Sequence, residues 1–175
     1  MITASDGVAG GYREDDAGAA VTAVLREAGV TLRRREVVAD DRAAIARLLA
    51  EICDDEGPSL VAVTGGTGLG PRDVTPEATR DVIEREVPGL AEAMRAVGRS
   101  VTPMADLSRG VCGVRGRTLI VDLPGSPRGA TESLEAILGV LDHALDLVAG
   151  QTHHAPGHGE HGHAHGRTAR DHPPM

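Results

Sequence analysis

The chain has 175 residues, a length that fits one domain with one core, and a formal net charge of −8. That charge argues against nucleic-acid binding through a basic surface. The sequence contains no Phe, no Trp and a single Tyr, so the core must be built from aliphatic residues. All 18 basic residues are arginines, which excludes lysine Schiff bases and a P-loop lysine. Phosphate charge would have to be met by Arg, backbone N–H groups and a metal ion.

The two cysteines, Cys53 and Cys112, lie on unrelated segments and form no metal or redox motif. Buried free thiols in a reducing cytosol are the simpler interpretation. The sequence shows no signal peptide and no apolar run long enough to span a membrane. It therefore predicts a cytoplasmic protein with neither a nucleic-acid nor a membrane partner.

The first half of the chain alternates apolar runs with stretches of helical spacing. One helix is expected between Ala17 and Ala28, and another follows a cap at Asp40 or Asp41. Strands are expected at Met1–Ala4, Thr31–Val38 and Leu60–Val63.

The second half continues the alternation. Helices are expected from Pro76, behind a cap at Thr75, to about Glu86, from Leu90 to about Val97, and from the last glycine turn to Val148. Residues 102–110 have no clear period, and a strand is expected over Arg117–Leu123. Strands and helices at this spacing predict an α/β fold with a parallel, mostly doubly wound sheet. Ligands bind such sheets at the carboxyl ends of the strands.

Two glycine-rich turns each follow an expected strand and precede an expected helix, at residues 64–68 (TGGTG) and 124–129 (PGSPRG). Glycines allow close approach of the backbone, and free N–H groups at a turn or helix start attract anions. In the second turn, the Ser126 hydroxyl and the Arg128 guanidinium add polar contacts for a phosphate. Either turn alone could instead be a structural tight turn.

Two aspartates are expected near these turns. Asp73 is a carboxylate at the rim of a phosphate site, or else an exposed loop aspartate or a salt-bridge partner of Arg72. Asp40 would also lie at the carboxyl end of a strand, but it is equally explained as a helix cap, a role that Asp41 could share.

The C-terminal residues 150–175 are rich in His, Gly and Pro and have no apolar face, so we expect a disordered tail. Imidazoles at this density can bind Ni, Zn or Cu weakly without a fold. A solvated tail with incidental metal affinity and a metal-storage role both fit. The tail histidines are His153, His154, His158, His161, His163, His165 and His172.

Several ordered motifs resemble the MogA and MoaB proteins of molybdenum cofactor biosynthesis and the gephyrin G domain. The matching pieces are TGGTG at 64–68, RDVTPEAT at 72–79, REVPGLAEAMR at 85–95, LSRG at 107–110 and LPGSPRG at 123–129. Ser5-Asp6, Glu14-Asp15 and Asp40-Asp41 fit the N-terminal pattern of the family. The resemblance covers about residues 1–149, the expected molybdopterin-binding domain, and leaves 150–175 outside.

The resemblance implies a three-layer α/β/α fold that assembles as a trimer or a dimer of trimers. It also implies adenylylation of molybdopterin by ATP with release of pyrophosphate, with Mg²⁺ and with other cofactor-biosynthesis proteins as partners. Asp40 and Asp73 match the catalytic carboxylates, which would help to hold the Mg²⁺. The residues that match the nucleotide and pterin pocket are Thr64, Gly65, Gly66, Thr67, Gly68, Ser108, Pro124, Gly125 and Ser126.

The sequence also departs from the family. Asp122 stands where many relatives have Asn, which adds a negative charge near an anion site. Met1 stands close to the first strand, which is therefore expected to be shortened unless the true start lies upstream. A non-catalytic molybdopterin-binding or scaffold protein is the alternative to an enzyme, and metal handling through the tail is a third hypothesis. The motifs leave open MogA-like or MoaB-like subfamily, trimer or hexamer, and molybdenum or tungsten.

Overall fold

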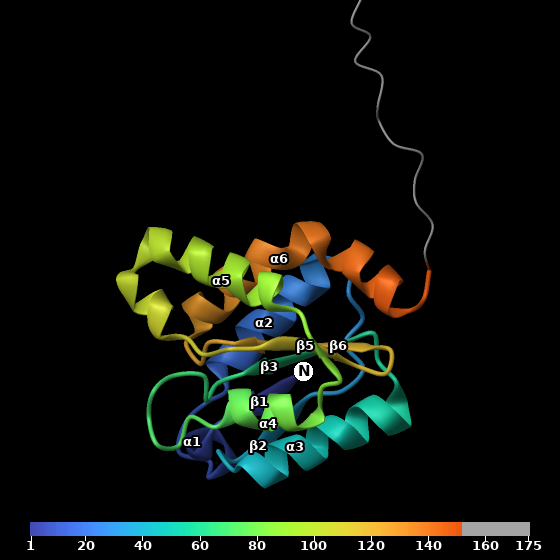
Figure 1. Cartoon of the computed structure of the whole chain (residues 1–175). Coiled ribbons are helices and arrows are strands. Elements are labelled where there is room, and N and C mark those ends of the chain that lie inside the picture. Colours follow the sequence, from blue (N-terminus) through green and yellow to red (C-terminus); the bar gives the residue numbers. More distant parts are fainter. Residues whose placement is uncertain (152–175) are drawn as a thin grey trace, which may run out of the picture.

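The computed structural model describes residues 1–151 (Figure 1). Its strands are β1 (Ile2–Ala4), β2 (Glu36–Val38), β3 (Leu60–Thr64), β4 (Arg85–Glu86), β5 (Cys112–Arg115) and β6 (Thr118–Leu123). Its α-helices are α1 (Asp6–Ala9), α2 (Asp16–Glu27), α3 (Arg42–Glu51), α4 (Thr75–Val82), α5 (Pro88–Val101) and α6 (Pro127–Val148). A π-helical turn extends α3 over Ile52–Glu56, and a 3-10 helix occupies Pro103–Leu107. The tail histidines lie outside the described residues.

One six-stranded sheet in the order β2-β1-β3-β6-β5-β4 forms the middle layer. Neighbouring strands are parallel from β2 through β1 and β3 to β6. Strand β5 pairs antiparallel with β6, and β4 pairs antiparallel with β5. The expected α/β fold with a mostly parallel sheet is therefore confirmed. The antiparallel edge follows from the short β5–β6 connection, which leaves no room for a crossover helix.

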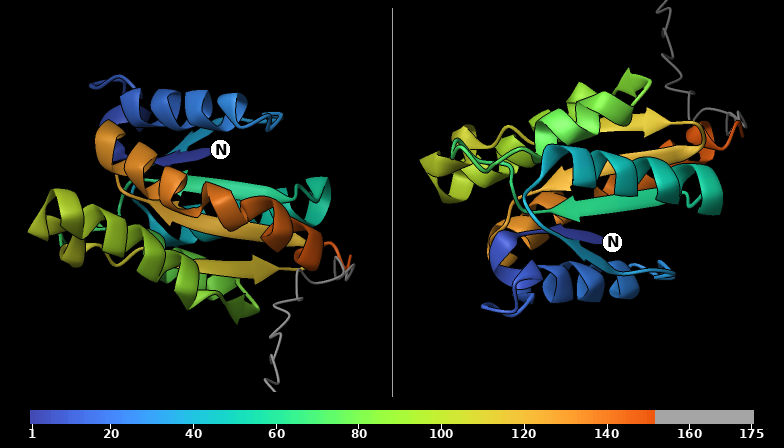
Figure 2. Two further views of the ribbon diagram at one scale, coloured as in Figure 1. Left: turned by 90° about the horizontal axis from the view of Figure 1, so that it is seen from above. Right: turned by 90° about the horizontal axis from the view of Figure 1, so that it is seen from below.

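Helices cover both faces of this sheet. Helices α2, α5 and α6 lie on one face, and α3 and α4 lie on the other (Figure 2). Alternate residues of β6 point to the two layers: Leu119 and Val121 pack with α5 and α6, and Ile120 packs with α3 and α4. The three-layer α/β/α arrangement is thus confirmed, and its two cores contain only small and aliphatic apolar side chains.

Several element boundaries differ from the sequence-based expectation. The expected strand Thr31–Val38 is a strand only from Glu36, and the helix expected to reach Glu86 ends at Val82. The chain turns extended at Ile83 because the next segment enters the sheet, where the Glu84 N–H donates to the Val114 carbonyl. Thr75 does not cap α4, since it is the first helical residue and its hydroxyl makes no capping bond.

Strand β1 is short, as expected. It pairs with β3 only through Ile2 and Thr3, although β3 itself pairs with β6 along all of Leu60–Thr64. Met1, residues 30–34 and residues 58–62 all line one cavity of about 320 Å³. None of the helices within residues 1–151 is both long and apolar enough to cross a membrane.

Candidate active site

The site is built from the loops that follow four parallel strands at one edge of the sheet. Strand β1 leads into Ser5 and Asp6, β2 into Asp40, β3 into a first glycine loop (residues 64–70), and β6 into a second glycine loop (residues 124–129). Because carboxyl ends of parallel strands meet at one sheet edge, segments far apart in the sequence become neighbours. The two glycine turns singled out in the sequence are adjacent.

The first glycine loop has a backbone that only glycine adopts without strain. Gly65 has φ of +98°, and a Cβ there would lie 2.1 Å from the carbonyl oxygen of Ala4. Gly66 has φ of +60°, and its Cβ would lie 2.5 Å from Thr75 Oγ1. Side chains at these positions would therefore clash in a conformation that they already disfavour. The loop backbone packs directly against the end of β1.

Consecutive N–H groups of this loop are free. Within residues 1–151, the amides of Gly66, Thr67, Gly68 and Leu69 donate to no protein acceptor. Successive free N–H groups in a tight turn form a concavity that binds anions. The amides on either side of them are bonded: the Gly65 N–H donates to the Leu123 carbonyl at 3.1 Å, and the Gly70 N–H donates to Asp73 Oδ2 at 2.7 Å.

The two glycine loops are joined directly. Thr64 Oγ1 donates to the Pro124 carbonyl at 2.6 Å, and a Cβ on Gly125 would lie 3.2 Å from Gly65 Cα. Thr64 is fully buried, so this bond is shielded from water. The pairing fixes the end of β3 against the end of β6 and sets both loops as one surface.

Asp40 is held by Asp6 rather than by a helix. The Asp6 N–H donates to Asp40 Oδ2 at 2.8 Å, and the Asp40 N–H donates to Asp6 Oδ1 at 3.0 Å. The other oxygen, Asp40 Oδ1, is buried and has no hydrogen-bond partner among the described residues. Burial raises the pKa of the Asp40 carboxyl above its usual value, and the charges of Asp6 and Asp73 act in the same direction.

The alternative that Asp40 caps a helix is wrong. The cap of α3 is Asp41, whose Oδ1 accepts the Ala44 N–H at 2.7 Å. Asp40 therefore has no structural role in α3, and its free oxygen is available to a ligand.

Asp73 stands between the first glycine loop and α4. Its Oδ2 accepts the Gly70 N–H at 2.7 Å, which folds the loop back on itself. The expected alternative, an ion pair with Arg72, is not formed, because Arg72 donates to both carboxylate oxygens of Asp6 at 3.0 Å. Asp6 thus links Asp40 to Arg72, a role that the sequence alone gave no reason to assign.

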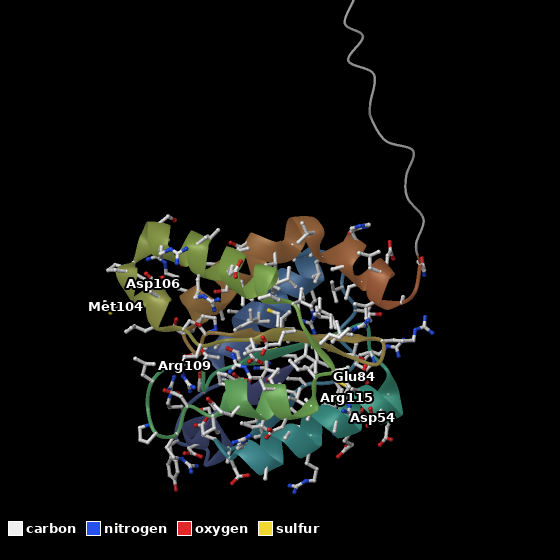
Figure 3. All side chains as sticks on the ribbon, in the orientation of Figure 1. Asp54, Glu84, Met104, Asp106, Arg109 and Arg115 are labelled. Carbon is white, nitrogen blue, oxygen red and sulfur yellow. The ribbon has the colours of Figure 1, made fainter. Side chains whose placement is uncertain are left out.

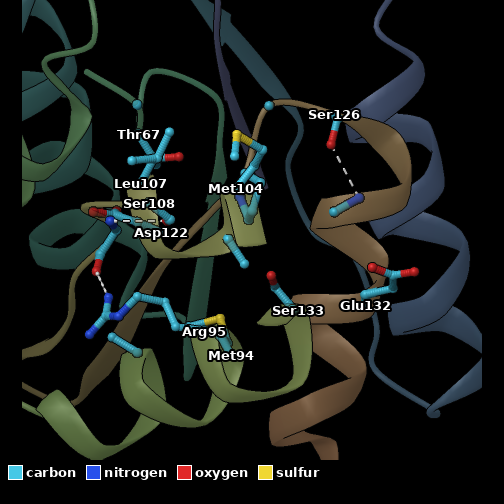
Figure 4. A pocket seen from close by; sticks show the side chains of 18 of the residues that line it. Thr67, Met94, Arg95, Met104, Leu107, Ser108, Asp122, Ser126, Glu132 and Ser133 are labelled. Atoms are coloured by element: carbon cyan, nitrogen blue, oxygen red, sulfur yellow. Dashed lines mark hydrogen bonds between the residues drawn. The ribbon is translucent and has the colours of Figure 1, made fainter. Parts of the chain in front are cut away.

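Two cavities open at this edge and share Gly66, Asp73 and Gly125 in their walls. The smaller, of about 260 Å³, also includes Asp40. The larger, of about 370 Å³, lies under α5 and the start of α6 (Figure 4). Two adjoining cavities that meet at Asp73 can hold two ligands with their reacting groups at the shared wall.

The larger cavity contains most of the expected pocket residues. It is lined by Gly66, Thr67, Gly68, Ser108, Pro124, Gly125 and Ser126. Ser126 also caps α6, because its Oγ accepts the Gly129 N–H at 3.2 Å. Met94, Met104 and Leu107 form an apolar wall beside these polar groups (Figure 4). Arg128 is not among the residues that line this cavity, and its Nε pairs at 2.7 Å with Glu132, which does line it. A partly apolar cavity with a polar rim suits a flat heterocycle that carries phosphate.

Asp122 is buried at the base of the larger cavity. Its Oδ1 accepts the Thr79 hydroxyl at 2.8 Å and its Oδ2 accepts the Val111 N–H at 3.1 Å. Burial raises the pKa of the Asp122 carboxyl to about 7, although these hydrogen bonds lower it in part. The sequence led us to expect that Asp122 adds a fixed negative charge. Its carboxyl instead titrates near neutrality.

Two arginines near the cavities were not singled out in the sequence. Arg95 is the one cationic side chain among the described residues that line the larger cavity, and its guanidinium makes a single long contact, 3.4 Å to the Gly110 carbonyl. Arg109 lies against the first glycine loop and the start of α4. Nothing in the sequence distinguishes these two from the other arginines, although both belong to matched motifs.

The residues present fit a divalent cation at the shared wall. Asp40 and Asp73 line the smaller cavity together, and the unpaired buried oxygen of Asp40 needs a partner. Within residues 1–151, no group of three or more His, Cys, Asp or Glu side chains is clustered for metal binding. A cation held by these two carboxylates would take its other ligands from substrate and water, as Mg²⁺ commonly does.

Known proteins resemble this chain in sequence and in fold. A family model described as a probable molybdopterin binding domain matches residues 1–143. A molybdopterin adenylyltransferase of Helicobacter pylori strain J99 is 40% identical over 152 residues, 86% of each chain. A molybdopterin adenylyltransferase of Escherichia coli K12 is 38% identical over 139 residues, 78% of this chain and 71% of the relative.

Solved structures share the fold. The molybdopterin biosynthesis enzyme MoaB of Thermus thermophilus superposes with a TM-score of 0.81 at 55% identity, over 85% of this chain and 94% of that one. The molybdopterin biosynthesis Mog protein of Mycobacterium ulcerans superposes with a TM-score of 0.78 at 40% identity, over 84% and 95%. Fold, loops and sequence agree, and the chain belongs to the MogA/MoaB family of molybdenum cofactor biosynthesis proteins.

Proposed function

We propose that the chain is a molybdopterin adenylyltransferase. In this reaction an oxygen of the terminal phosphate of molybdopterin attacks the α-phosphorus of ATP, and the bond from that phosphorus to the bridging oxygen breaks. The products are adenylylated molybdopterin and pyrophosphate. The observation that carries the proposal is the pair of cavities that meet at Asp73 and the free N–H groups of the first glycine loop. The names of the curated relatives support the same activity.

The chemistry suits the residues that line the cavities. Phosphoryl-type transfer needs positioning and charge neutralisation more than it needs a protein nucleophile. The free amides of Gly66, Thr67, Gly68 and Leu69 offer donors to phosphate oxygens, and the guanidinium of Arg95 offers a cation in the larger cavity. The apolar wall of the larger cavity supports binding of a heterocycle.

We assign Mg²⁺ to Asp40 and Asp73. When bound, the metal would neutralise charge on the phosphates of the substrate. The buried, unpaired Oδ1 of Asp40 supports this assignment, because a buried carboxylate oxygen without a partner is costly and a bound cation would offset that cost. The proposed pocket residues remain Thr64, Gly65, Gly66, Thr67, Gly68, Ser108, Pro124, Gly125 and Ser126.

The enzyme would act as a homotrimer, or as a dimer of trimers, in the cytoplasm. Exposed apolar side chains on α5 and the following turn support an interface; they are Val97, Val101, Met104 and Leu107. Two free buried cysteines support a reducing compartment. Light scattering during size-exclusion chromatography would decide between trimer and hexamer.

Single-turnover adenylylation tests the activity. Purified protein is mixed with molybdopterin, Mg²⁺ and ATP labelled at the α-phosphate, and label in the pterin is measured. We expect transfer by the wild-type chain and a loss of about 100-fold or more in Asp73→Asn and Asp40→Asn, because each removes a charge from the metal site. The matched control is Asp41→Asn, which keeps a good helix cap and should retain transfer.

A non-catalytic molybdopterin-binding or scaffold protein is the alternative. Tight pterin binding with no label transfer by wild-type protein would establish it and refute the enzyme. Metal handling through the tail is tested by deleting residues 152–175. The proposed enzyme predicts unchanged label transfer after that deletion.

A further inference from the structure

Arg109 lies in the connection between the 3-10 helix and β5, and it crosses the back of the first glycine loop. Its backbone N–H donates to the Thr67 carbonyl at 2.8 Å. Its Nε donates to the Gly68 carbonyl at 2.7 Å. One residue thus engages two successive carbonyls of the loop, from its main chain and from its side chain.

The same guanidinium also reaches the far end of the loop. Nη2 donates to the Asp73 carbonyl at 2.6 Å, and Nη1 pairs with the Glu77 carboxylate on α4. The fork of Arg109 therefore bridges the residues that begin and end the turn from Gly68 to Asp73. A planar guanidinium with donors in fixed directions can make these bonds together, whereas a lysine ammonium on a flexible chain would make only some of them.

The bonds to carbonyls determine where the amides point. In a planar trans peptide the C=O and the following N–H point in opposite directions. Because the carbonyls of Thr67 and Gly68 face Arg109, the N–H groups of Gly68 and Leu69 point away from it. These two amides are among those that donate to no protein acceptor within residues 1–151. Arg109 thus occupies the acceptor side of the loop and leaves the donor side open.

We propose that Arg109 is a positioning residue that holds the first glycine loop with its N–H groups presented to a phosphate of the substrate. It does not touch the substrate itself. Among residues 1–151, its hydrogen bonds and its ion pair are with Thr67, Gly68, Asp73 and Glu77, and its side chain is about one-third exposed (34%). The inference rests on the proposed function only for the identity of the phosphate ligand. That Arg109 holds the loop, which we call the clamp, follows from its own hydrogen bonds.

Arg115 supplies a matched control. Its guanidinium donates to both oxygens of Asp54, at 2.9 and 2.7 Å, and to the Val82 carbonyl at 2.9 Å. It therefore makes a similar fork of bonds, but away from the two glycine loops. Arg109 and Arg115 lie on opposite sides of the molecule in the view of Figure 3.

The test compares Arg109→Lys with Arg115→Lys in the full chain. Backbone ¹⁵N order parameters measure loop rigidity without any ligand, and calorimetry measures the Kd for ATP with Mg²⁺. In Arg109→Lys we expect the order parameters of Gly68 and Leu69 to fall from about 0.85 to below about 0.6. We expect the Kd for ATP to rise about tenfold. Arg115→Lys should lower the melting temperature about as much as Arg109→Lys does. It should leave the order parameters of Gly68 and Leu69 unchanged and the Kd for ATP within about twofold of wild type.

A third variant separates the clamp from the ion pair. Glu77→Gln removes the charge that faces Arg109 but leaves its bonds to the carbonyls of Thr67, Gly68 and Asp73, so the loop should stay ordered. Unchanged order parameters and ATP affinity in Arg109→Lys would overturn the inference. Failure of wild-type protein to bind ATP would instead count against the proposed function, and the order parameters would still decide the role of Arg109.

Discussion

Replacing Asp122 with Asn should stabilise the protein more at alkaline pH than at acidic pH. The Asp122 carboxyl has a pKa of about 7 in the folded chain, against a usual value of 3.8. A raised pKa means that the folded chain binds a proton more tightly than the unfolded chain does. The stability that depends on this proton is present at low pH, is lost between about pH 4 and pH 7, and is absent above that range.

The difference in pKa sets an upper limit on the effect. At 1.36 kcal/mol per pKa unit, the gap from 3.8 to about 7 corresponds to roughly 4 kcal/mol of unfolding free energy at alkaline pH. An Asn at this position keeps both hydrogen bonds: its oxygen accepts the Val111 N–H, and its amide donates to the Thr79 hydroxyl, which can rotate to accept. We therefore expect a gain of about 2–4 kcal/mol at pH 8.5 and a smaller gain of about 1–2 kcal/mol at pH 5, where the carboxyl is ionised only in the unfolded chain.

Urea unfolding of wild-type and Asp122→Asn protein at pH 5 and pH 8.5 measures this difference. Asp54→Asn is a control of opposite sign, because the hydrogen bond from Arg115 lowers the pKa of Asp54. The stability that Asp54 provides is present above its usual pKa and is lost as pH falls through its lowered value. An equal gain from Asp122→Asn at both pH values would refute the reasoning, since a charge effect must shrink as the pH falls toward the pKa of the carboxyl in the unfolded chain.

Three further results are expected. Gly65→Ala should abolish the folded site, because its Cβ would lie 2.1 Å from the Ala4 carbonyl oxygen; circular dichroism and soluble yield measure the loss. Leu134→Ala should lower the unfolding free energy by about 2–5 kcal/mol, because Leu134 is fully buried in the core, and urea titration that gave less than about 1 kcal/mol would contradict this. Burial raises the pKa of the Cys53 thiol to about 11 and that of Cys112 to about 12, so a disulfide reagent at pH 8 should label native protein far more slowly than unfolded protein; equal rates would exclude buried thiols.

Much of the fold was predictable because its signals are local. Apolar strands followed by glycine turns, and helices with regular stripes, fix the parallel part of the sheet. The short strands β4 and β5 were missed because two to four residues carry too little periodicity. Strand β2 also proved shorter than expected: only Glu36–Val38 have β1 beside them, and β1 begins at Ile2.

The site was predictable in its parts but not in its connections. The glycine turns and Asp73 could be found from strand-end position and residue type. The sequence could not show whether Asp40 or Asp41 caps α3, because the two are neighbours with the same side chain. The choice depends on Asp6, which follows another strand and bonds to Asp40. The contacts of Arg109 are also non-local, since they join residues 32 to 42 positions apart.

The bond between Thr64 and Pro124 has a consequence for synthesis of the chain. These residues are 60 positions apart, and so are Pro58 and Thr118, which are bonded at the other end of the β3–β6 pair. At ribosomal speeds of about 5–20 residues per second, the apolar strand β3 emerges several seconds before its partner. During that interval a nascent chain exposes an unpaired strand edge, which is the surface that chaperones shield. The two glycine loops can meet only after β6 has been translated, so this end of the sheet is assembled only once both strands of the β3–β6 pair have emerged.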